Sequence, residues 1–271
     1  MQSTDQGMPS ALGSISHLEL SNVRVVLTDF DDTLTLEGKL PADTLSALYR
    51  LQEAGIDVIP VTGGCAGWSD MMVRVLPISG VITEGGGLFM QYQGGSVRYH
   101  YFQDEASMRA QQAALLTMVQ PRLERFSALK LTRDQAYRLT DVAIDYAQDI
   151  YPPALSEKDA LLSELRQLGL NAKASSIHIN VCQDGVDKFA MSQQVLREVF
   201  HMSRHEQQAS VLYVGDAPND ESMFANFPLS VGVANIKPHL PNLKHKPAFI
   251  TDAAGGLGFA ELVSVLLDAK A

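Results

Sequence analysis

The chain has 271 residues, of which 46% are hydrophobic and 19% are charged, the composition of an ordinary globular protein with one large or two smaller domains. Its formal net charge of −10 argues against general affinity for nucleic acid and for anionic membrane surfaces. No stretch reaches the roughly 18 continuous apolar residues that span a bilayer, and two cysteines are too few for a disulfide framework. We therefore expect a cytoplasmic protein without a nucleic-acid or membrane partner.

The N-terminal third of the chain alternates between apolar runs and helical spacing. Residues 1–21 have no basic start and no unbroken apolar stretch, which predicts a flexible N-terminal tail. The elements expected after it are a strand at 23–28, a helix at 41–54, a strand at 56–61, a helix at 68–75 and a short strand at 80–82. This alternation predicts a parallel sheet covered by helices on both faces.

The pattern changes at residue 84. Two apolar runs flank Gly94-Gly95, which is a hairpin signal and implies antiparallel pairing. The elements expected next are helices at 105–119 and from Ser156, and strands at 142–147, 171–175 and 177–182. We expect residues 84–185 to form an inserted α+β cap domain.

The alternating pattern then resumes to the end of the chain. The expected elements are helices at 186–200 and 258–267 and strands at 211–214, 229–233 and 249–251. The predicted fold is α/β, a doubly wound, Rossmann-like parallel sheet formed by residues 22–83 and 186–271, with the cap domain inserted between them.

Two acidic residues, Asp29 and Asp31, directly follow the first predicted strand. Residues i and i+2 of a strand lie on the same side, so these carboxylates would crowd each other. Two unit charges about 4 Å apart repel by roughly 4 kcal/mol at an effective dielectric near 20. A fold that accepts this repulsion is expected to offset it with a cation, so the pair predicts a metal-dependent active site.

Three further segments fall at the carboxyl ends of predicted strands or beside them, where open parallel sheets build ligand sites. Thr62 ends the second strand and offers a hydroxyl, while Gly63 and Gly64 leave backbone N–H groups exposed for a phosphate. Lys188 opens the helix after the insert. Asp216 and Asp220 belong to the loop after the strand at 211–214.

These segments together resemble the haloacid dehalogenase (HAD) superfamily of phosphohydrolases. The resemblance rests on four motifs in the family's order, Asp29-Phe30-Asp31-Asp32-Thr33-Leu34, Thr62-Gly63, Gly185-Val186-Asp187-Lys188 and Gly215-Asp216-Ala217-Pro218-Asn219-Asp220. The insert resembles the type II, subclass B cap of Cof-type phosphatases, sucrose-phosphate phosphatase and phosphomannomutase. The C-terminal stretches Val231–Asn235 and Gly255–Gly258 resemble that group as well.

The resemblance implies a mechanism with two catalytic aspartates. Asp29 would be the nucleophile that forms an aspartyl-phosphate, and Asp31 would act as general acid and then as general base. Thr62, Gly63 and Lys188 would bind the phosphoryl oxygens.

The resemblance also implies a Mg²⁺ site. Asp29, the backbone carbonyl of Asp31 and Asp216 would bind the ion, and Asp220 or Asn219 would complete or orient its shell. Hard oxygen ligands with no His or Cys nearby in sequence favour Mg²⁺ over Zn²⁺.

The chain departs from the family pattern at three positions, where Gly64 follows the second motif, Gly85 follows Glu84, and Phe189 follows Lys188. These departures concern substrate identity more than chemistry. His178 and Asn180 alternate to the same face of the last cap strand and are candidate substrate contacts.

The predicted function is a Mg²⁺-dependent phosphatase that acts on a small phosphorylated metabolite, such as a sugar or sugar-acid phosphate. The alternative is a phosphomutase of the phosphomannomutase type, which shares this cap but needs a second basic phosphate site. We find no dense arginine cluster between residues 84 and 185. The sequence leaves a homo-oligomer open as a partner.

Overall fold

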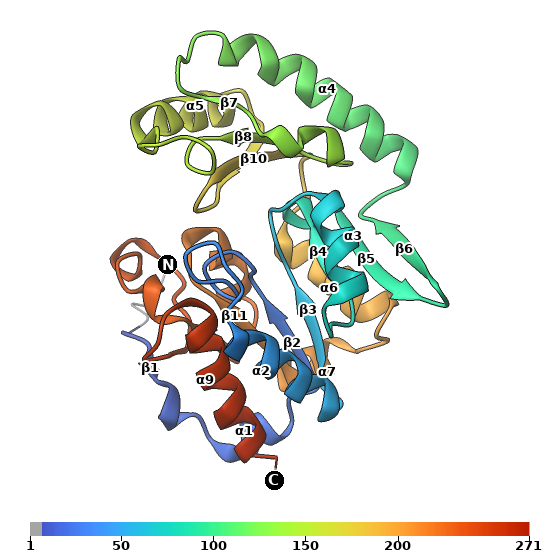
Figure 1. Cartoon of the computed structure of the whole chain (residues 1–271), viewed down its shortest axis with the longest axis vertical. Helices are drawn as coiled ribbons and strands as arrows, with labels where there is room; N and C mark the ends of the chain where they lie inside the picture. Colours follow the sequence, from blue (N-terminus) through green and yellow to red (C-terminus); the bar gives the residue numbers. More distant parts are fainter. Residues whose placement is uncertain (1–6, 271) are drawn as a thin grey trace. The chain divides into compact units, whose positions relative to one another are not determined.

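The computed structural model describes residues 7–270, which form two compact units (Figure 1). Within the described residues, the sheet unit comprises residues 7–60, Leu76–Ser79 and residues 196–270. The insert unit comprises Val61–Val75 and Gly80–Val195. Among the residues described, no helix is long and apolar enough to cross a membrane.

A six-stranded sheet is the centre of the sheet unit, and within the described residues its neighbouring strands all pair in parallel, as the alternating sequence pattern predicts. In spatial order its strands are β1 (Ser10–Ala11), β13 (Phe249–Ile250), β12 (Ser230–Gly232), β11 (Val211–Gly215), β2 (Val25–Thr28) and β3 (Asp57–Pro60). The chain passes from β2 to β3 on one side and later places β11 on the other side of β2. This reversal is the switch point at which open α/β sheets bind ligands.

Helices cover the sheet. The α-helices of this unit are α1 (His17–Ser21), α2 (Ala42–Glu53), α7 (Arg204–Ser210), α8 (Glu221–Phe224) and α9 (Gly255–Asp268). Its 3-10 helices are η1 (Leu12–Ser14), η4 (Pro218–Asp220), η5 (Ala234–Ile236) and η6 (Leu240–Asn242).

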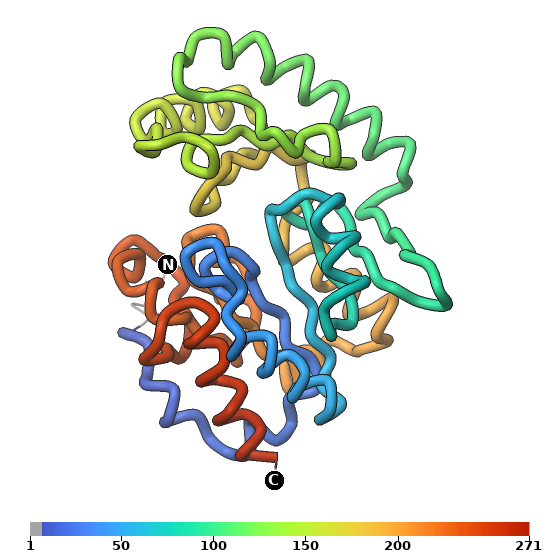
Figure 2. The backbone as a smooth tube through the Cα atoms, in the orientation of Figure 1, coloured from blue at the N-terminus to red at the C-terminus, as the bar shows by residue number. Residues whose placement is uncertain are grey.

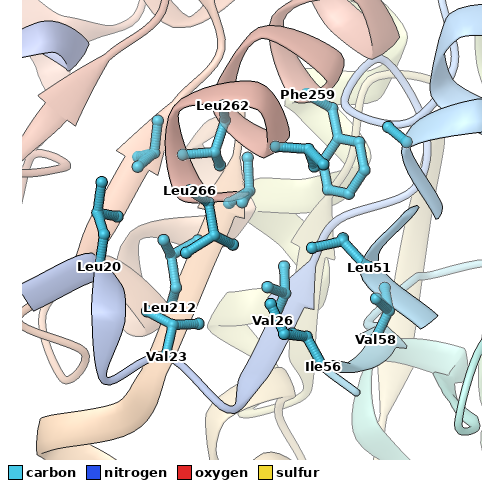
Figure 3. Close-up of a cluster of buried hydrophobic side chains, with 14 of the residues drawn as sticks. Leu20, Val23, Val26, Leu51, Ile56, Val58, Leu212, Phe259, Leu262 and Leu266 are labelled. Carbon is cyan, nitrogen blue, oxygen red and sulfur yellow. The ribbon is translucent and has the colours of Figure 1, made fainter. Parts of the chain in front are cut away.

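The main core of this unit lies between the sheet and helices α2 and α9. In Figure 3, Phe259, Leu262 and Leu266 of α9 share one cluster with Val26 of β2 and Leu212 of β11. The alternate strand residues on the other face are also buried, and the Tyr213 ring packs on Phe224 and Phe227 with centroids 5.6 and 6.4 Å apart. Both faces of the sheet are therefore covered, which confirms the doubly wound α/β fold.

The prediction of a flexible N-terminal tail is wrong for residues 10–21, while residues 1–6 lie outside the described part of the chain. Strand β1 pairs with β13, and Leu12, Ile15 and Leu20 are buried in the main core. Ser16 and Glu19 form a capping box that starts α1. Figure 2 shows this N-terminal segment beside the C-terminal helix, where Lys270 Nζ donates to the Ser21 carbonyl at 2.8 Å. The apolar residues are too widely spaced to be recognised without their partners.

The insert unit contains two antiparallel sheets. One consists of β4 (Val81–Thr83), β5 (Leu88–Gln93) and β6 (Ser96–Tyr101); the other, in spatial order, of β7 (Lys130–Leu131), β8 (Val142–Asp145), β10 (His178–Cys182) and β9 (Asn171–Ala174). The predicted hairpin is confirmed, and Gly94 and Gly95 turn the chain with positive φ angles of 60° and 83°.

The α-helices of the insert unit are α3 (Ala66–Val75), α4 (Glu105–Leu123), α5 (Leu155–Gln167) and α6 (Lys188–Glu198). The part of α6 after Val195 belongs to the sheet unit. The 3-10 helices of the insert unit are η2 (Glu84–Gly86) and η3 (Arg133–Tyr137). Residues of α4, α5, β8 and β10 share one buried hydrophobic cluster. This division differs from the predicted boundaries, because it places α3, β4 and most of α6 with the inserted segment.

Three predicted elements need correction. Strand β4 pairs antiparallel with β5 and meets Val61 by a single parallel bridge at Ile82, rather than forming a full third strand of the parallel sheet. Helix α5 begins at Leu155, so Ser156 lies inside it and is not its cap. The helix predicted at 186–200 ends at Glu198, and a separate helix, α7, follows.

Candidate functional site

Three buried carboxylates meet at the carboxyl edge of the parallel sheet. Asp29 follows β2, while Asp216 and Asp220 follow the neighbouring strand β11. The backbone N–H of Asp29 donates to the Val214 carbonyl at 2.8 Å, which continues the pairing of the two strands to this point. One carboxylate oxygen from each of the three aspartates lies within 4.8 Å of the others, as the sequence led us to expect.

Two residues that the sequence did not single out hold Asp216 in place. The Thr33 hydroxyl donates to its Oδ1 at 2.9 Å, and Asn235 Nδ2 donates to its Oδ2 at 3.0 Å. Asn235 Nδ2 also donates to the Asp32 carbonyl, and its Oδ1 accepts the N–H of Gly255. Thr33 and Asn235 both lie in motifs quoted above, so membership of a motif was the signal that could have identified them. Their bonding partner, Asp216, is more than fifteen residues away from each in sequence.

Asp220 shapes the loop that carries Asp216. Its Oδ1 accepts the Tyr213 hydroxyl at 2.6 Å, and its Oδ2 accepts the N–H groups of Asp216 at 3.0 Å and Ala217 at 3.2 Å. A Cβ on Gly215 would lie 2.5 Å from the same Oδ2, so the loop closes this tightly only because residue 215 is a glycine. Asp220 therefore has a clear structural role besides its place in the cluster.

The electrostatics of the cluster favour a bound cation. Burial, and next the charges of Asp29 and Asp220, raise the pKa of Asp216 well above its usual value. Burial and the charge of Asp220 likewise raise the pKa of Tyr213 well above its usual value. Like charges this close in a buried site are costly unless a cation or a proton offsets them.

The donor set fits a hard divalent cation. Asn219 stands between the two clustered residues of its loop, and its Oδ1 is buried without a hydrogen-bond partner within residues 7–270. Three carboxylates and a spare amide oxygen are the ligands that Mg²⁺ and Ca²⁺ take, whereas Zn²⁺ favours nitrogen and sulfur. Asp29, Asp216 and Asp220, with Asn219 near them, could therefore hold such an ion.

Asp31 is half-buried in the turn that follows Asp29. The Phe30 carbonyl accepts the N–H groups of Leu34 at 2.9 Å and Thr35 at 3.1 Å, and Asp32 takes a positive φ of 57°. This turn leads the chain sharply away from the sheet after Asp29. The main-chain carbonyl of Asp31 is the predicted metal ligand, and its side chain is the predicted general acid and base. Both roles stay predictions.

The second motif lies in the insert unit, where every carbonyl of Thr62–Gly64 is bonded. The Thr62 carbonyl accepts the N–H of Gly85 at 3.1 Å, and the Thr62 hydroxyl oxygen accepts the N–H of Gly64 at 2.9 Å. Because that oxygen accepts from Gly64, its own hydrogen points elsewhere and is available as a donor. The prediction of an exposed Gly64 N–H is wrong, because this hydroxyl oxygen accepts it. The geometry is compatible with the predicted phosphate binding by Thr62 and Gly63, which stays a prediction.

Lys188 is the first residue of α6 and is only 5% exposed. A Cβ on Gly86, whose φ is +113°, would lie 2.3 Å from the Asp187 carbonyl oxygen and 3.1 Å from the Lys188 nitrogen. The glycine thus lets the η2 loop contact the backbone that carries Lys188. The N–H of Gly85, in the same loop, donates to the Thr62 carbonyl, so this one loop positions both Thr62 and Lys188.

The two predicted substrate contacts on β10 are both buried and both have protein partners. Asn180 Nδ2 donates to the Gly63 carbonyl at 3.0 Å and to Asp141 Oδ2 at 2.8 Å. His178 Nε2 contacts Gln148 Oε1, and burial lowers the pKa of His178 to about 4, so its ring is neutral at pH 7. Asn180 thus supports the second motif, and substrate binding by either residue stays a prediction.

Comparison with known proteins gives structural matches only. No protein-family model and no curated protein matches the sequence. A HAD/Cof-like hydrolase from Plasmodium vivax matches with a TM-score of 0.68 and 19% identity, over 93% of this chain and 98% of the other. A haloacid dehalogenase-like hydrolase from Bacteroides thetaiotaomicron matches with a TM-score of 0.62 and 19% identity, over 90% and 99% of the two chains.

A third match is the sucrose-phosphatase from Synechocystis, solved in complex with sucrose and phosphate. Its TM-score is 0.61 at 16% identity, over 90% of this chain and 98% of the other. Likenesses at such low identity show a common fold, and they extend over nearly the whole of each chain. The chain that carries this buried carboxylate cluster therefore has the fold of the haloacid dehalogenase-like hydrolases.

Proposed function

We propose that the chain is a Mg²⁺-dependent phosphatase that hydrolyses a small phosphorylated metabolite, such as a sugar or sugar-acid phosphate. The observation that carries the proposal is the cluster of Asp29, Asp216 and Asp220, with carboxylate oxygens within 4.8 Å of one another. It stands at the carboxyl ends of β2 and β11, beside the switch point of the sheet. Solved neighbours with this fold include a sucrose-phosphatase, which supports a phosphate ester as substrate.

In the proposed reaction Asp29 is the nucleophile. Its carboxylate oxygen attacks phosphorus, the bond from phosphorus to the leaving oxygen breaks, and Asp31 donates a proton to that oxygen. Asp31 then takes a proton from water as the water attacks the aspartyl-phosphate, and the bond between phosphorus and Asp29 breaks to release inorganic phosphate. Thr62, Gly63 and Lys188 bind the phosphoryl oxygens, as their motifs predict.

A bound Mg²⁺ would offset the charge of the clustered carboxylates and of the phosphoryl group. Thr33 and Asn235 keep both oxygens of Asp216 oriented, and Asp220 keeps the loop closed. These hydrogen bonds hold the ligands before the substrate arrives, which lowers the reorganisation needed during the reaction.

The test is phosphate release from a panel of phosphorylated metabolites, measured with Mg²⁺ and with EDTA. Wild type, Asp29→Asn and the exposed-site control Asp252→Asn are compared. Release that requires Mg²⁺, is lost in Asp29→Asn and is kept in Asp252→Asn supports the proposal. Release that persists in Asp29→Asn refutes the assigned nucleophile. An isomerised ester without net phosphate release would instead identify a phosphomutase.

A further inference from the structure

A fully buried arginine contacts the second motif from within the insert unit. The Arg138 side chain is 0% exposed, and its Nη1 donates to the Gly63 carbonyl at 3.0 Å. The same Nη1 donates to both oxygens of Asp141, at 3.0 and 3.1 Å, while Nε and Nη2 donate to Asp134 at 3.1 and 3.3 Å. Carboxylates thus hold the planar guanidinium from two sides, which leaves it one orientation.

Asn180 strengthens the same contact. Its Nδ2 donates both to the Gly63 carbonyl, at 3.0 Å, and to Asp141 Oδ2, at 2.8 Å. The Gly63 carbonyl therefore accepts two hydrogen bonds, from Arg138 and from Asn180. Both donors are bound to the same buried carboxylate of Asp141, so the three side chains form one rigid support.

The main-chain carbonyls of Thr62 and Gly64, on either side of Gly63, also accept hydrogen bonds. The Thr62 carbonyl accepts the N–H of Gly85 at 3.1 Å. The Gly64 carbonyl accepts the N–H of Glu84 at 3.0 Å and the Thr83 hydroxyl at 2.7 Å. Three successive carbonyls are thus held by groups of the insert unit.

Glu84 links this loop to the segment that carries Arg138. Its buried carboxylate accepts the N–H groups of Ala66 at 2.9 Å and Leu139 at 3.0 Å, and both the N–H and the hydroxyl of Thr140 at 2.6 Å. Leu139 and Thr140 lie between Arg138 and Asp141 in sequence. The 138–141 segment is therefore bonded at two points. The Arg138 guanidinium donates to the Gly63 carbonyl, and residues 139 and 140 donate to the Glu84 carboxylate.

Fixing these carbonyls fixes the N–H groups of the segment. A trans peptide is planar and its N–H points away from its C=O, so the bond to Thr62 O orients the Gly63 N–H, and the bonds to Gly63 O orient the Gly64 N–H. Gly-Gly has more backbone freedom than any other pair, and ordering it costs more conformational entropy. A segment of this sequence stays in one conformation only if its surroundings hold it.

A buried ion pair is an inefficient way to gain stability, because apolar residues of similar volume often do as well. The side chains of Arg138 and Asp141 are both fully buried. Burial raises the pKa of Asp141, and the guanidinium of Arg138 acts to lower it. Arg138 provides what an apolar residue cannot, a directed hydrogen bond to the Gly63 carbonyl, and Asp141 orients both Arg138 and the second donor, Asn180.

We infer that Arg138, oriented by Asp141 and assisted by Asn180, is a positioning residue that holds the Thr62–Gly64 segment in its phosphate-binding conformation. The inference rests on the proposed function for the role of that segment, and on the structure alone for the anchoring. Arg138 acts through Gly63 and need not touch the substrate.

Two variants and a control test the inference. Arg138→Met removes the guanidinium but leaves buried carboxylates without their cation, so it also risks misfolding. Arg138→Met/Asp141→Asn removes both fully buried charges of the pair and leaves only Asp134, whose side chain is 14% exposed, without its cation, so this variant is expected to fold. Arg122→Met is the matched control, because Arg122 pairs with Glu164 in the same unit at 3.4 Å and is remote in sequence from Thr62 and its partners.

The first readout does not depend on activity. With selective ¹⁵N-glycine labelling, the chain gives signals from 20 glycines, and Gly64→Ala identifies that of Gly64. The Gly64 amide donates to the Thr62 hydroxyl oxygen, so its hydrogen exchange reports the order of the segment. Exchange of this amide should accelerate at least about tenfold in the double variant and stay at the wild-type rate in Arg122→Met.

The second readout is turnover of the best substrate from the metabolite panel. Because displacement of about 1 Å can cost roughly 100-fold in rate, we expect the double variant to lose about that factor in kcat, with a smaller change in KM. A purely structural role would lower the unfolding temperature but leave the kcat of the folded fraction unchanged.

Two outcomes would overturn the inference. One is a folded double variant in which Gly64 exchanges at the wild-type rate. The other is accelerated exchange with unchanged kcat. Absence of phosphate release from wild type would refute the proposed function, while exchange of Gly64 would still decide whether Arg138 holds the segment.

Discussion

Asp216→Asn should stabilise the metal-free protein and abolish its response to Mg²⁺. Asp216 lies in a buried cluster with two other carboxylates, and the pKa of Asp216 is raised mainly by burial and then by those charges. Asparagine has almost the same shape and carries no charge. It removes the repulsion that the cation would otherwise offset, and it also removes one ligand of that cation.

The magnitude follows from the geometry. The carboxylate oxygens lie no more than 4.8 Å apart, and at that limit and an effective dielectric near 20 two ionised carboxylates repel by about 3.5 kcal/mol; Asp216 takes part in two such pairs. Against this gain, the amide keeps only one acceptor oxygen, so the bond from Thr33 or from Asn235 is lost, which costs roughly 1.5–3 kcal/mol. Proton uptake by the wild-type cluster already relieves part of the repulsion. We therefore expect a net gain of about 1–3 kcal/mol in the free energy of unfolding.

The assay is thermal unfolding at pH 7.5 with EDTA and with Mg²⁺. In EDTA, Asp216→Asn should unfold a few degrees above wild type, because about 1 kcal/mol shifts the unfolding temperature by roughly 2–4 °C in a chain of this size. Saturating Mg²⁺ should raise the wild-type temperature, since a ligand at 100 times its Kd adds about 2.7 kcal/mol, and should leave Asp216→Asn almost unchanged. The control Asp252→Asn should follow wild type in both buffers. An Asp216→Asn protein that is less stable than wild type in EDTA would refute the charge argument.

Three further predictions concern stability. Tyr213→Phe removes the hydroxyl that donates to buried Asp220 at 2.6 Å, and urea unfolding should show a loss of about 1.5–3 kcal/mol; an unchanged midpoint would contradict this bond's importance. Leu20→Ala should cost about 2–5 kcal/mol because Leu20 is 1% exposed in the main core, whereas Leu18→Ala, at 73% exposure in the same helix, should cost almost nothing; equal midpoints would disprove the packing of this segment. Burial lowers the pKa of His178 from 6.5 to about 4. Between these pH values the unfolded chain binds a proton that the folded chain does not. The free energy of unfolding therefore falls by roughly 3 kcal/mol as the pH falls from 6.5 to 4. His178→Gln should remove that part of the acid destabilisation, and an identical pH profile would show that His178 does not cause it.

The parts of the fold that depend on local pattern could be predicted from the sequence. The apolar runs of β2, β3 and β11 and the helical spacing of α2 predict a parallel α/β sheet by themselves, because both faces of such strands must be buried. The Gly-Gly hairpin between β5 and β6 is equally local.

The candidate metal ligands were predictable for a similar reason. Asp29 and Asp216 directly follow predicted strands, and the carboxyl ends of parallel strands share one edge of the sheet. Their partners were not predictable, because Thr33 and Asn235 bind Asp216 across long sequence separations. A hydrogen bond between distant residues leaves no periodic signal in either segment.

The amino-acid sequence by itself determined the fold class and the positions of the candidate metal-binding carboxylates, since both follow from short-range pattern and strand order. Only the tertiary structure decided that residues 10–21 pack into the core and that β4 pairs with β5. It also decided that Arg138, paired with Asp141, donates to the carbonyl of Gly63, 75 residues from Arg138 in sequence. The physical reason is that a buried charge or a lone apolar side chain acquires its role from groups distant in sequence, whose approach depends on the whole fold.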